Sequence, residues 1–223
     1  MRPSLIALAA AVALTGAGLF LTVSANRPDV NQVPIISNQP RHPVTPAMTE
    51  DAARRARKDA PDFEKKDYEG KAVEIGRPHP GKLQFAYFVL EGCPCSIEVE
   101  PLFHELWKVH RKNVDFVAVI NKDDKVARQW SVDMLTPYPV VADPKGEVIT
   151  AYDAPNSAYS ALIDDKGRII KVWPGYSSSI LLEMNKLMAE EMGQKPTKFD
   201  PQYAPKEATS GCAFDFKPQI ISG

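Results

Sequence analysis

The chain has 223 residues, a formal net charge of −1 at pH 7 and a hydrophobic content of 44%. This length suits one ordinary domain with tails, and the balanced charge argues against the basic surface that nucleic-acid binding requires. The prolines gather towards the two ends of the chain. Because proline rarely continues a helix or a central strand, this distribution indicates extended tails around a central domain.

The N-terminus has the pattern of an export signal. Arg2 precedes an apolar stretch from Leu5 to Val23, and Val23-Ser-Ala25 suits cleavage by a signal peptidase. The stretch is also just long enough to cross a bilayer, so residues 5–23 are the expected membrane contact if they are not removed. The sequence therefore predicts residues 1–25 as a signal peptide or N-terminal membrane anchor, and a protein that is exported to the periplasm or the extracellular space.

Three further regions follow. Residues 26–62 are rich in proline and polar side chains and are predicted to form a linker, with one short helix from Glu50 to Lys58 capped by Thr49. Residues 63–193 form the predicted domain. Residues 194–223 return to proline and polar composition and form an extended C-terminal tail that carries Cys212.

Within the domain, short apolar runs alternate with segments of helical period. The expected strands are residues 83–90, 114–120, 139–142, 159–163 and 168–173. The expected helices are residues 96–112, 122–130, 147–152 and 178–192. The order is a βαβ unit followed by an antiparallel hairpin and a closing helix, which predicts a three-layer α/β domain with a mixed sheet.

The segment Cys93-Pro94-Cys95-Ser96 lies directly between the first strand and the first long helix. A cysteine at the start of a helix feels the positive end of the helix dipole, which favours the reactive thiolate. Three carboxylates nearby, Glu91, Glu98 and Glu100, oppose it, so we expect a modest lowering of the Cys93 pKa carried by the helix end.

The pattern resembles the thioredoxin-fold redoxins, the branch that includes alkyl-hydroperoxide-reductase-like and thiol-disulfide-exchange proteins. Four segments carry the resemblance: Gly92-Cys93-Pro94 with Pro101-Leu102 in the following helix, Tyr138 to Gly146, Leu162 to Ile169, and Thr209-Ser-Gly211-Cys212. The resemblance implies a thioredoxin-like three-layer fold with a central mixed β-sheet flanked by helices.

The chain departs from this family at three points. Thioredoxins separate their two cysteines by two residues, whereas one residue separates Cys93 from Cys95. The proline and the threonine or serine that position peroxide in peroxiredoxins are missing before both cysteines. The family's cis-proline, which faces the cysteine and helps to hold substrate, aligns with Ala158.

The resemblance implies catalysis by Cys93, Cys95 and Cys212. Cys93 is the expected nucleophile, and either Cys95 or Cys212 would resolve the intermediate. A disulfide across Cys-Pro-Cys closes a small ring that is hard to build without strain. A structural disulfide from Cys212 to the domain is the alternative for that residue.

The leading prediction is thus an exported thiol-disulfide oxidoreductase of redoxin type, with peroxide reduction as a sub-case. Its expected partners are protein thiols and disulfides or small peroxides, together with a thiol electron donor, and no cofactor or bound metal is expected. Two other functions stay open on the same fold. One is a Cu(I)-binding, metallochaperone-like protein, since thiolates suit Cu(I). The other is a redox-inactive binding domain.

Overall fold

The structure, a computed structural model, describes residues 42–216, which belong to one compact unit. The predicted signal or anchor at residues 1–25, the first part of the predicted linker and the last seven residues of the tail lie outside the described residues. No helix within residues 42–216 is long and apolar enough to cross a membrane.

A five-stranded mixed sheet in the order β5-β4-β3-β6-β7 forms the centre of the domain. Its central strand β3 (Leu83–Val89) pairs in parallel with β4 (Val114–Ile120), which pairs in parallel with β5 (Val140–Ala142). On the other side, β6 (Ser160–Ile163) and β7 (Ile169–Trp173) run antiparallel as a hairpin. The strands expected from the sequence are confirmed within a few residues at their ends.

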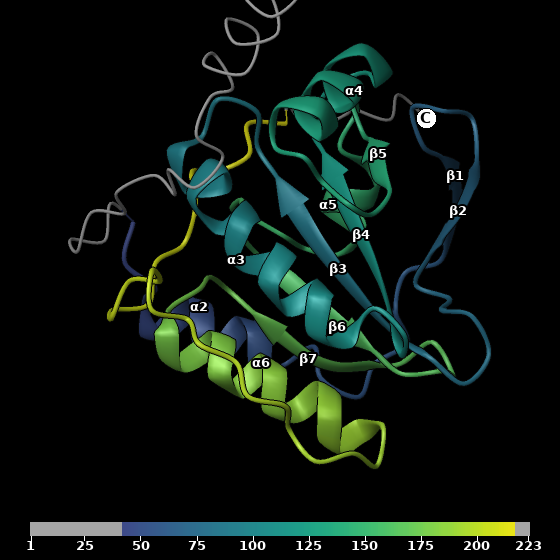
Figure 1. Cartoon of the computed structure of the whole chain (residues 1–223). Helices are drawn as coiled ribbons and strands as arrows, with labels where there is room; N and C mark the ends of the chain where they lie inside the picture. Colours follow the sequence, from purple (N-terminus) through teal and green to yellow (C-terminus); the bar gives the residue numbers. More distant parts are fainter. Residues whose placement is uncertain (1–41, 217–223) are drawn as a thin grey trace, which may run out of the picture. The chain divides into compact units, whose positions relative to one another are not determined.

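Helices cover both faces of this sheet (Figure 1). On one face lie α3 (Pro94–His110), α4 (Asp124–Asp133) and α6 (Ser178–Glu191). On the opposite face lie α2 (Pro46–Ala53) and α5 (Glu147–Ala151). The predicted three-layer α/β architecture is therefore confirmed.

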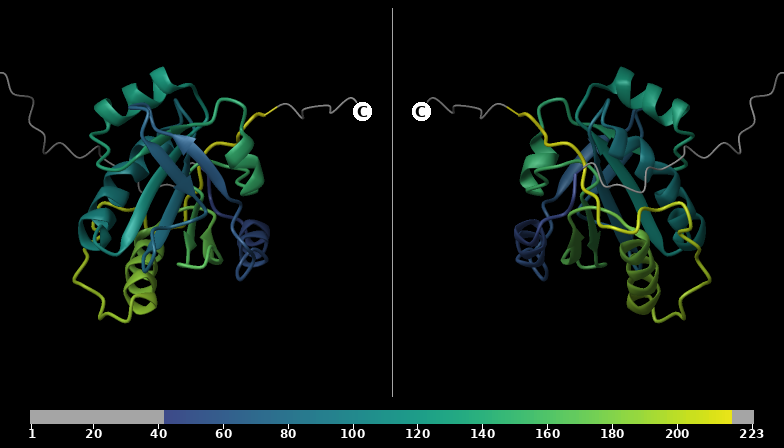
Figure 2. Two further views of the ribbon diagram at one scale, coloured as in Figure 1. Left: turned by 90° about the vertical axis from the view of Figure 1, so that its right-hand side faces the viewer. Right: turned by 90° about the vertical axis from the view of Figure 1, so that its left-hand side faces the viewer.

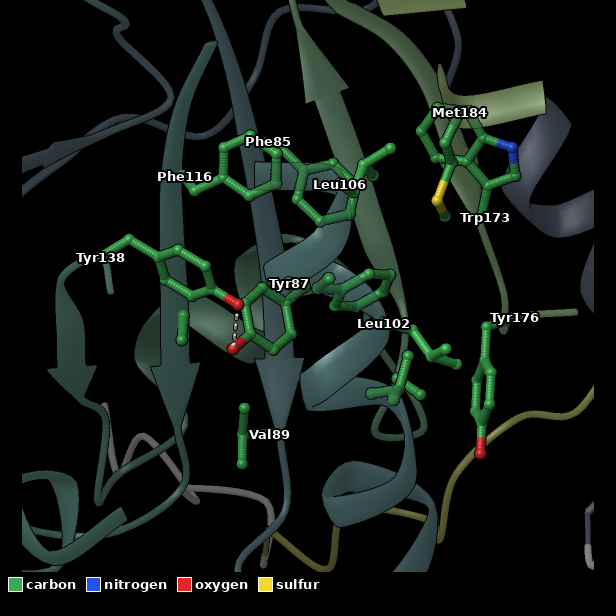
Figure 3. Packing of buried hydrophobic residues seen from close by; sticks show 14 of the residues in the cluster. Phe85, Tyr87, Val89, Leu102, Leu106, Phe116, Tyr138, Trp173, Tyr176 and Met184 are labelled. Atoms are coloured by element: carbon green, nitrogen blue, oxygen red, sulfur yellow. Dashed lines mark hydrogen bonds between the residues drawn. The ribbon is translucent and has the colours of Figure 1, made fainter. Parts of the chain in front are cut away.

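All seven residues of β3 are buried, because both faces of this strand are covered. Phe85, Tyr87 and Val89 point towards α3, as Figure 3 shows. Phe85 packs edge-on against Phe103 of α3, with ring centroids 5.0 Å apart, and lies 5.1 Å from Phe116 of β4. This aromatic layer fixes α3 on the sheet and so fixes the position of the cysteines at its first turn.

Two parts of the structure differ from the sequence-based expectation. A small antiparallel pair, β1 (Phe63–Lys66) and β2 (Ala72–Ile75), precedes the central sheet and was not expected. The short helix in the predicted linker starts four residues earlier than expected, because Thr45 caps it and Pro46 occupies its first turn. Ala52 of this helix is buried and packs on the face of the sheet opposite α3, in the cluster that includes Ile169 and Val172 of β7.

After α6 the described chain turns back across the domain as far as residue 216 without forming a further helix or strand (Figure 2). At Ala204 the chain lies beside the start of α6, where the Ser178 hydroxyl donates a hydrogen bond of 3.1 Å to the Ala204 carbonyl oxygen. From there the tail continues to the beginning of α3, where Cys212 meets Cys93.

Candidate active site at the start of α3

Cys93 is the N-cap residue of α3, at the end of the short turn that follows β3. Its backbone is extended, with φ −80° and ψ 121°, and its carbonyl oxygen accepts the first hydrogen bonds of the helix, from the amides of Ser96 and Ile97. Pro94 occupies the first helical position, where proline costs no hydrogen bond. The β3–α3 junction thus places the Cys93 thiol at the positive end of a 17-residue helix.

Hydrogen-bond donors from three segments surround Cys93 Sγ. The hydroxyl of Ser157 lies 3.3 Å from the sulfur, and the backbone amide of Cys212 lies 3.2 Å from it. The thiols of Cys95 and Cys212 also donate to Cys93. Only 2% of Cys93 is exposed, so these donors replace water around the sulfur.

This arrangement separates the properties of the two cysteines of the Cys-Pro-Cys segment. The hydrogen bond from the Cys95 thiol, followed by those from Cys212 and Ser157, lowers the pKa of Cys93 to about 3 even though burial opposes it. The same hydrogen bond, with burial and the nearby charges, raises the pKa of Cys95 well above its ordinary value. Cys93 is accordingly a thiolate and Cys95 a thiol at neutral pH.

The lowering of the Cys93 pKa is larger than the modest change expected from the sequence. Its main cause is the hydrogen bond from the Cys95 thiol, whereas the sequence-based expectation relied on the helix end. Sequence spacing places three carboxylates close to the thiol. In the structure Glu100 points away into the core, where it accepts hydrogen bonds from Thr136 and Tyr138, at 2.7 and 3.3 Å. Ser157 and Cys212, which help to stabilise the thiolate, come from segments far away in the sequence, so local spacing could not reveal them.

Ser157 reaches Cys93 because of a tight turn before β6. Ala158, which aligns with the family's cis-proline, has a left-handed backbone with φ 60°, unusual for a residue other than glycine. Its amide donates to the carbonyl oxygen of Phe88 across 2.9 Å, which ties the turn to the end of β3. Ser157 thereby faces the sulfur from the position next to the missing proline.

The tail residues around Cys212 pair with this turn as an extended strand would. The amide of Gly211 donates to the Ser157 carbonyl oxygen, and the Ser157 amide donates to the Cys212 carbonyl oxygen, both across 2.9 Å. The Asn156 side-chain amide adds a bond of 3.0 Å to the Gly211 carbonyl oxygen. These contacts fix Cys212 against Cys93.

The three cysteines singled out from the sequence therefore lie together, although Cys212 is far from the others along the chain. Sequence reasoning missed Ser157 and His42. His42 Nε2 lies 3.5 Å from the Cys212 sulfur. Neither residue belongs to a recognisable sequence motif. The sequence offered one indication of the role of Ser157, namely that it neighbours the position of the missing cis-proline.

The other histidines lie away from the sulfur atoms. His104 contacts Glu100 further along α3, with 3.1 Å between Nε2 and Oε1, and His79 contacts Asp115. A groove of about 860 Å³ lies near the far end of α3, lined by His79, Trp107 and Arg111 among others, and none of the three cysteines lines it. Within residues 42–216, no group of three or more His, Cys, Asp or Glu side chains is arranged to hold a metal ion.

Comparison with known proteins identifies the family of the chain. The family model described as Redoxin matches residues 55–186. The chain belongs to the Redoxin family. It is 32% identical over 129 residues to the thiol-disulfide oxidoreductase ResA of Bacillus thuringiensis, covering 56% of this chain and 73% of that protein. It is 30% identical over 123 residues to ResA of Bacillus subtilis, covering 52% of this chain and 66% of that protein.

Solved structures agree on the fold of this redoxin. A putative thiol:disulfide interchange protein DsbE from Chlorobium tepidum superposes with a TM-score of 0.55 at 20% identity, covering 62% of this chain and 98% of that chain. An uncharacterised protein from Geobacillus kaustophilus gives a TM-score of 0.59 at 19% identity, covering 73% and 93%. The predicted thioredoxin-like redoxin fold is confirmed, and the protein is a thiol-dependent oxidoreductase of the thiol-disulfide type.

In this redoxin, Ser96 stands where thioredoxins have their second cysteine, separated by two residues from the first, and the structure shows what it contacts. Ser96 is 1% exposed, and its hydroxyl accepts a hydrogen bond of 3.2 Å from the Leu90 amide. Serine holds the turn in place at that position but cannot form a disulfide, so Cys95 and Cys212 are the other sulfur atoms of cysteine that the described chain places near Cys93.

Proposed function

We propose that this redoxin exchanges disulfides with proteins, with Cys93 as the nucleophile and Cys212 as the resolving cysteine. One observation carries the proposal: the Cys212 backbone amide donates a 3.2 Å hydrogen bond to Cys93 Sγ, so the tail holds its cysteine against the thiolate. The reciprocal backbone bonds between the tail and Ser157 keep it there.

The reaction balances as two thiol–disulfide exchanges. The Cys93 thiolate attacks one sulfur of a substrate disulfide, a Cys93–substrate disulfide forms, and the other substrate sulfur leaves as a thiolate that takes up a proton. Cys212, once deprotonated, attacks Cys93 Sγ and releases the second substrate thiol. The substrate gains two electrons and two protons, the enzyme holds a Cys93–Cys212 disulfide, and an external dithiol reduces it again.

Cys95 suits a different role. It occupies the first turn of α3, and a disulfide to Cys93 would close the small ring of the Cys-Pro-Cys segment, which is hard to build without strain. Its raised pKa keeps the proton with which it stabilises the Cys93 thiolate. We therefore assign Cys95 as a hydrogen-bond donor that tunes Cys93.

A protein substrate fits this site better than a small peroxide. Cys93 is covered by a peptide segment that is held through backbone hydrogen bonds, and such bonds are a general means of holding an extended chain. The residues that position peroxide in peroxiredoxins are missing before both Cys93 and Cys95. Peroxide reduction is accordingly not part of the proposal.

The proposed place of action is outside the cytoplasm. The charged start at Arg2, the apolar stretch from Leu5 to Val23 and the cleavage pattern ending at Ala25 support export. Fractionation of a bacterial host that expresses the full chain, with N-terminal sequencing, tests this. A mature chain that begins at Asn26 indicates a signal peptide, an intact chain in the membrane fraction indicates an anchor, and an intact chain in the cytosol contradicts export.

Trapping experiments test the assignment of the cysteines. The reduced protein is mixed with a disulfide-containing protein such as insulin, quenched with acid and examined by mass spectrometry. We expect the Cys212→Ser variant to accumulate a mixed disulfide through Cys93, the Cys95→Ser variant to form the Cys93–Cys212 disulfide, and Cys93→Ser to form neither. Accumulation of the mixed disulfide in Cys95→Ser instead would identify Cys95 as the resolving residue. A Cu(I) titration of the same reduced samples tests the metal-binding alternative.

A further inference from the structure

The tail occupies a groove that has the features of a peptide-binding site. Residues 208–213 form backbone hydrogen bonds on both sides. Thr209 and Tyr176 exchange two bonds of 2.8 and 2.9 Å, and the Ser210 amide donates to the His42 carbonyl oxygen across 2.7 Å. Gly211 and Cys212 pair with Ser157. An extended segment is thus held almost entirely through its backbone, as in the addition of a strand to a sheet edge.

The same segment closes the access to Cys93. The thiol is 2% exposed, while Thr209 and Ser210 of the tail are themselves buried, at 2% and 1%. A substrate sulfur can reach Cys93 only after the tail has left, and it then meets the backbone groups that the tail has vacated. The tail has to return and displace the substrate chain when Cys212 attacks the mixed disulfide. The Ser157 amide and carbonyl are among these groups, and they determine how the incoming chain pairs.

This groove leaves no room for a side chain directly before the reacting cysteine. A Cβ atom on Gly211 would lie 1.9 Å from the Ser157 hydroxyl oxygen and 2.6 Å from the Ser157 carbonyl oxygen. The hydroxyl could rotate, but the carbonyl belongs to the backbone and accepts the Gly211 amide, so it cannot retreat without breaking that bond. Gly211 is therefore required by the close approach of two backbones.

We propose that the tail is the intramolecular occupant of a substrate groove, and that this groove selects an extended protein segment with glycine immediately before the reacting cysteine. Ser157 is the residue that determines this specificity. The inference rests on the proposed function, since it concerns the substrate of the same Cys93 thiolate. It adds the chemical class of that substrate, a Gly-Cys segment in extended conformation.

The test uses two peptides that differ by one methyl group, Thr-Ser-Gly-Cys-Ala-Phe and Thr-Ser-Ala-Cys-Ala-Phe, each with its cysteine joined to 2-thiopyridine through a disulfide. The Cys93 thiolate attacks the peptide sulfur, a Cys93–peptide disulfide forms, and 2-thiopyridone leaves and is followed by its absorbance. The protein is the full chain with Gly211→Ala and Cys212→Ser, whose tail can neither dock nor react. We expect the glycine peptide to react about tenfold faster or more, since one ill-fitting methyl group costs a site that much.

Three controls make the outcomes distinct. Both peptides are first reacted with dithiothreitol, which reports their intrinsic reactivity. The small disulfide 2,2′-dithiodipyridine reports whether Cys93 is intact in the variant. The single variant Cys212→Ser, which keeps Gly211, is expected to react with the glycine peptide more slowly than the double variant, because its tail still fills the groove.

Equal rates for the two peptides in the double variant would overturn the glycine specificity and leave the Cys93 chemistry standing. Equal rates for the single and double variants would overturn the role of the tail as occupant. If Cys93 reacts with neither the peptides nor dithiodipyridine, the proposed function fails together with the inference. As a matched control, Gly193→Ala adds the same methyl group at the start of the tail, where no other part of the described chain lies within 4 Å, and Cys93 in this variant should react as it does in the wild type.

Discussion

The backbone amide of Cys212 donates a hydrogen bond to the sulfur of Cys93 although the two residues are 119 positions apart in the chain. This single contact stabilises the Cys93 thiolate and holds a second sulfur in position at the same time. The tail therefore has two effects on the active site, one on the pKa of the nucleophile and one on its accessibility. Substitutions at different residues can separate these two effects.

The first prediction concerns the donors that lower the Cys93 pKa. Ser157→Ala removes the hydroxyl donor at 3.3 Å, and Cys95→Ala removes the thiol donor that contributes most. Both variants should raise the Cys93 pKa from about 3 towards its ordinary value, Cys95→Ala by more. A titration of the thiolate absorbance in the ultraviolet measures this, with Cys93→Ser as the control that lacks the low-pH step. No change in Cys95→Ala would contradict the assigned cause.

A second prediction follows for the pH dependence of stability. The Cys93 pKa is about 3 in the folded protein, against about 8.5 for a thiol in an unfolded chain. Between these values the unfolded state binds more protons, so this contribution to stability is full above the unfolded pKa and is lost as the pH falls through the folded pKa. In urea unfolding of the reduced proteins, the difference in unfolding free energy between wild type and Cys93→Ser should grow as the pH rises from about 4 to about 8. A difference that stays constant or shrinks would contradict the low pKa.

The third prediction concerns the position of the tail. A Cβ atom on Gly175 would lie 2.2 Å from the carbonyl oxygen of Thr209, so Gly175→Ala should break the two bonds that Thr209 exchanges with Tyr176. At about 1 kcal/mol for each bond, the open tail becomes roughly 30-fold more populated. Alkylation of Cys93 by iodoacetamide, located by mass spectrometry, should accelerate accordingly.

The control for this experiment is again Gly193→Ala. Gly193 has a left-handed backbone with φ 64°, and an added Cβ atom there would have no other atom of the described chain within 4 Å, so alanine adds local strain without touching the groove. Some loss of melting temperature is expected from this strain, but the alkylation rate of Cys93 should not rise. An equal rise in both variants would mean that alkylation reports general loosening of the fold.

His42 is expected to assist the resolving step. Its Nε2 atom lies 3.5 Å from the Cys212 sulfur, close enough to take up the thiol proton when Cys212 attacks the mixed disulfide. His42→Gln should slow formation of the Cys93–Cys212 disulfide about tenfold or more, without slowing the first attack by Cys93. Rapid-quench mass spectrometry separates the two steps. His79→Gln, at an exposed histidine elsewhere, serves as the control, and equal rates in both variants would exclude this role.

Much of the fold could be predicted from the sequence because its signals are local. The continuous apolar run at Leu83–Val89 indicates a strand covered on both faces, and helical spacing locates α3 and α6. The short helix α2 is predicted one turn too late because Pro46 lies in a proline-rich segment typical of a linker, whereas proline is also favoured at the first position of a helix. The strands β1 and β2 have only four residues each, so the alternation of exposed and buried residues in them is too short to stand out in the sequence.

The active site was predictable only in part. Cys93 and Cys95 could be identified from the sequence as candidate active-site residues, because they lie between a predicted strand and a predicted helix. The neighbours that influence their chemistry, Ser157 and His42, come from a turn and from an N-terminal segment whose positions depend on tertiary packing. The glycine next to Cys212 indicates a flexible tail in the sequence, but its closest contact is Ser157, which only the three-dimensional structure reveals.

The last prediction concerns the stability of the layer that supports α3. Glu100 is fully buried, and its carboxyl group contacts Thr136, Tyr138 and His104, together with the Tyr87 hydroxyl, which donates to it. Burial raises the pKa of both tyrosines well above the ordinary value, so they remain hydroxyl donors. Glu100→Ala leaves these donors without an acceptor and opens a cavity, which should cost about 2–5 kcal/mol of unfolding free energy.

Glu100→Gln preserves the volume and one acceptor oxygen, so it should cost less than half as much as the alanine substitution. Urea unfolding at neutral pH, followed by tryptophan fluorescence, measures both. Glu105→Ala is the matched control, because Glu105 lies on the exposed side of the same helix and pairs only with Lys108 within the described chain; it should change the unfolding free energy by no more than about 0.5 kcal/mol. If Glu100→Ala were as stable as this control, the carboxyl group could not be what holds α3 against β3 and the segment before β5, and the position of Cys93 would depend on the aromatic packing alone.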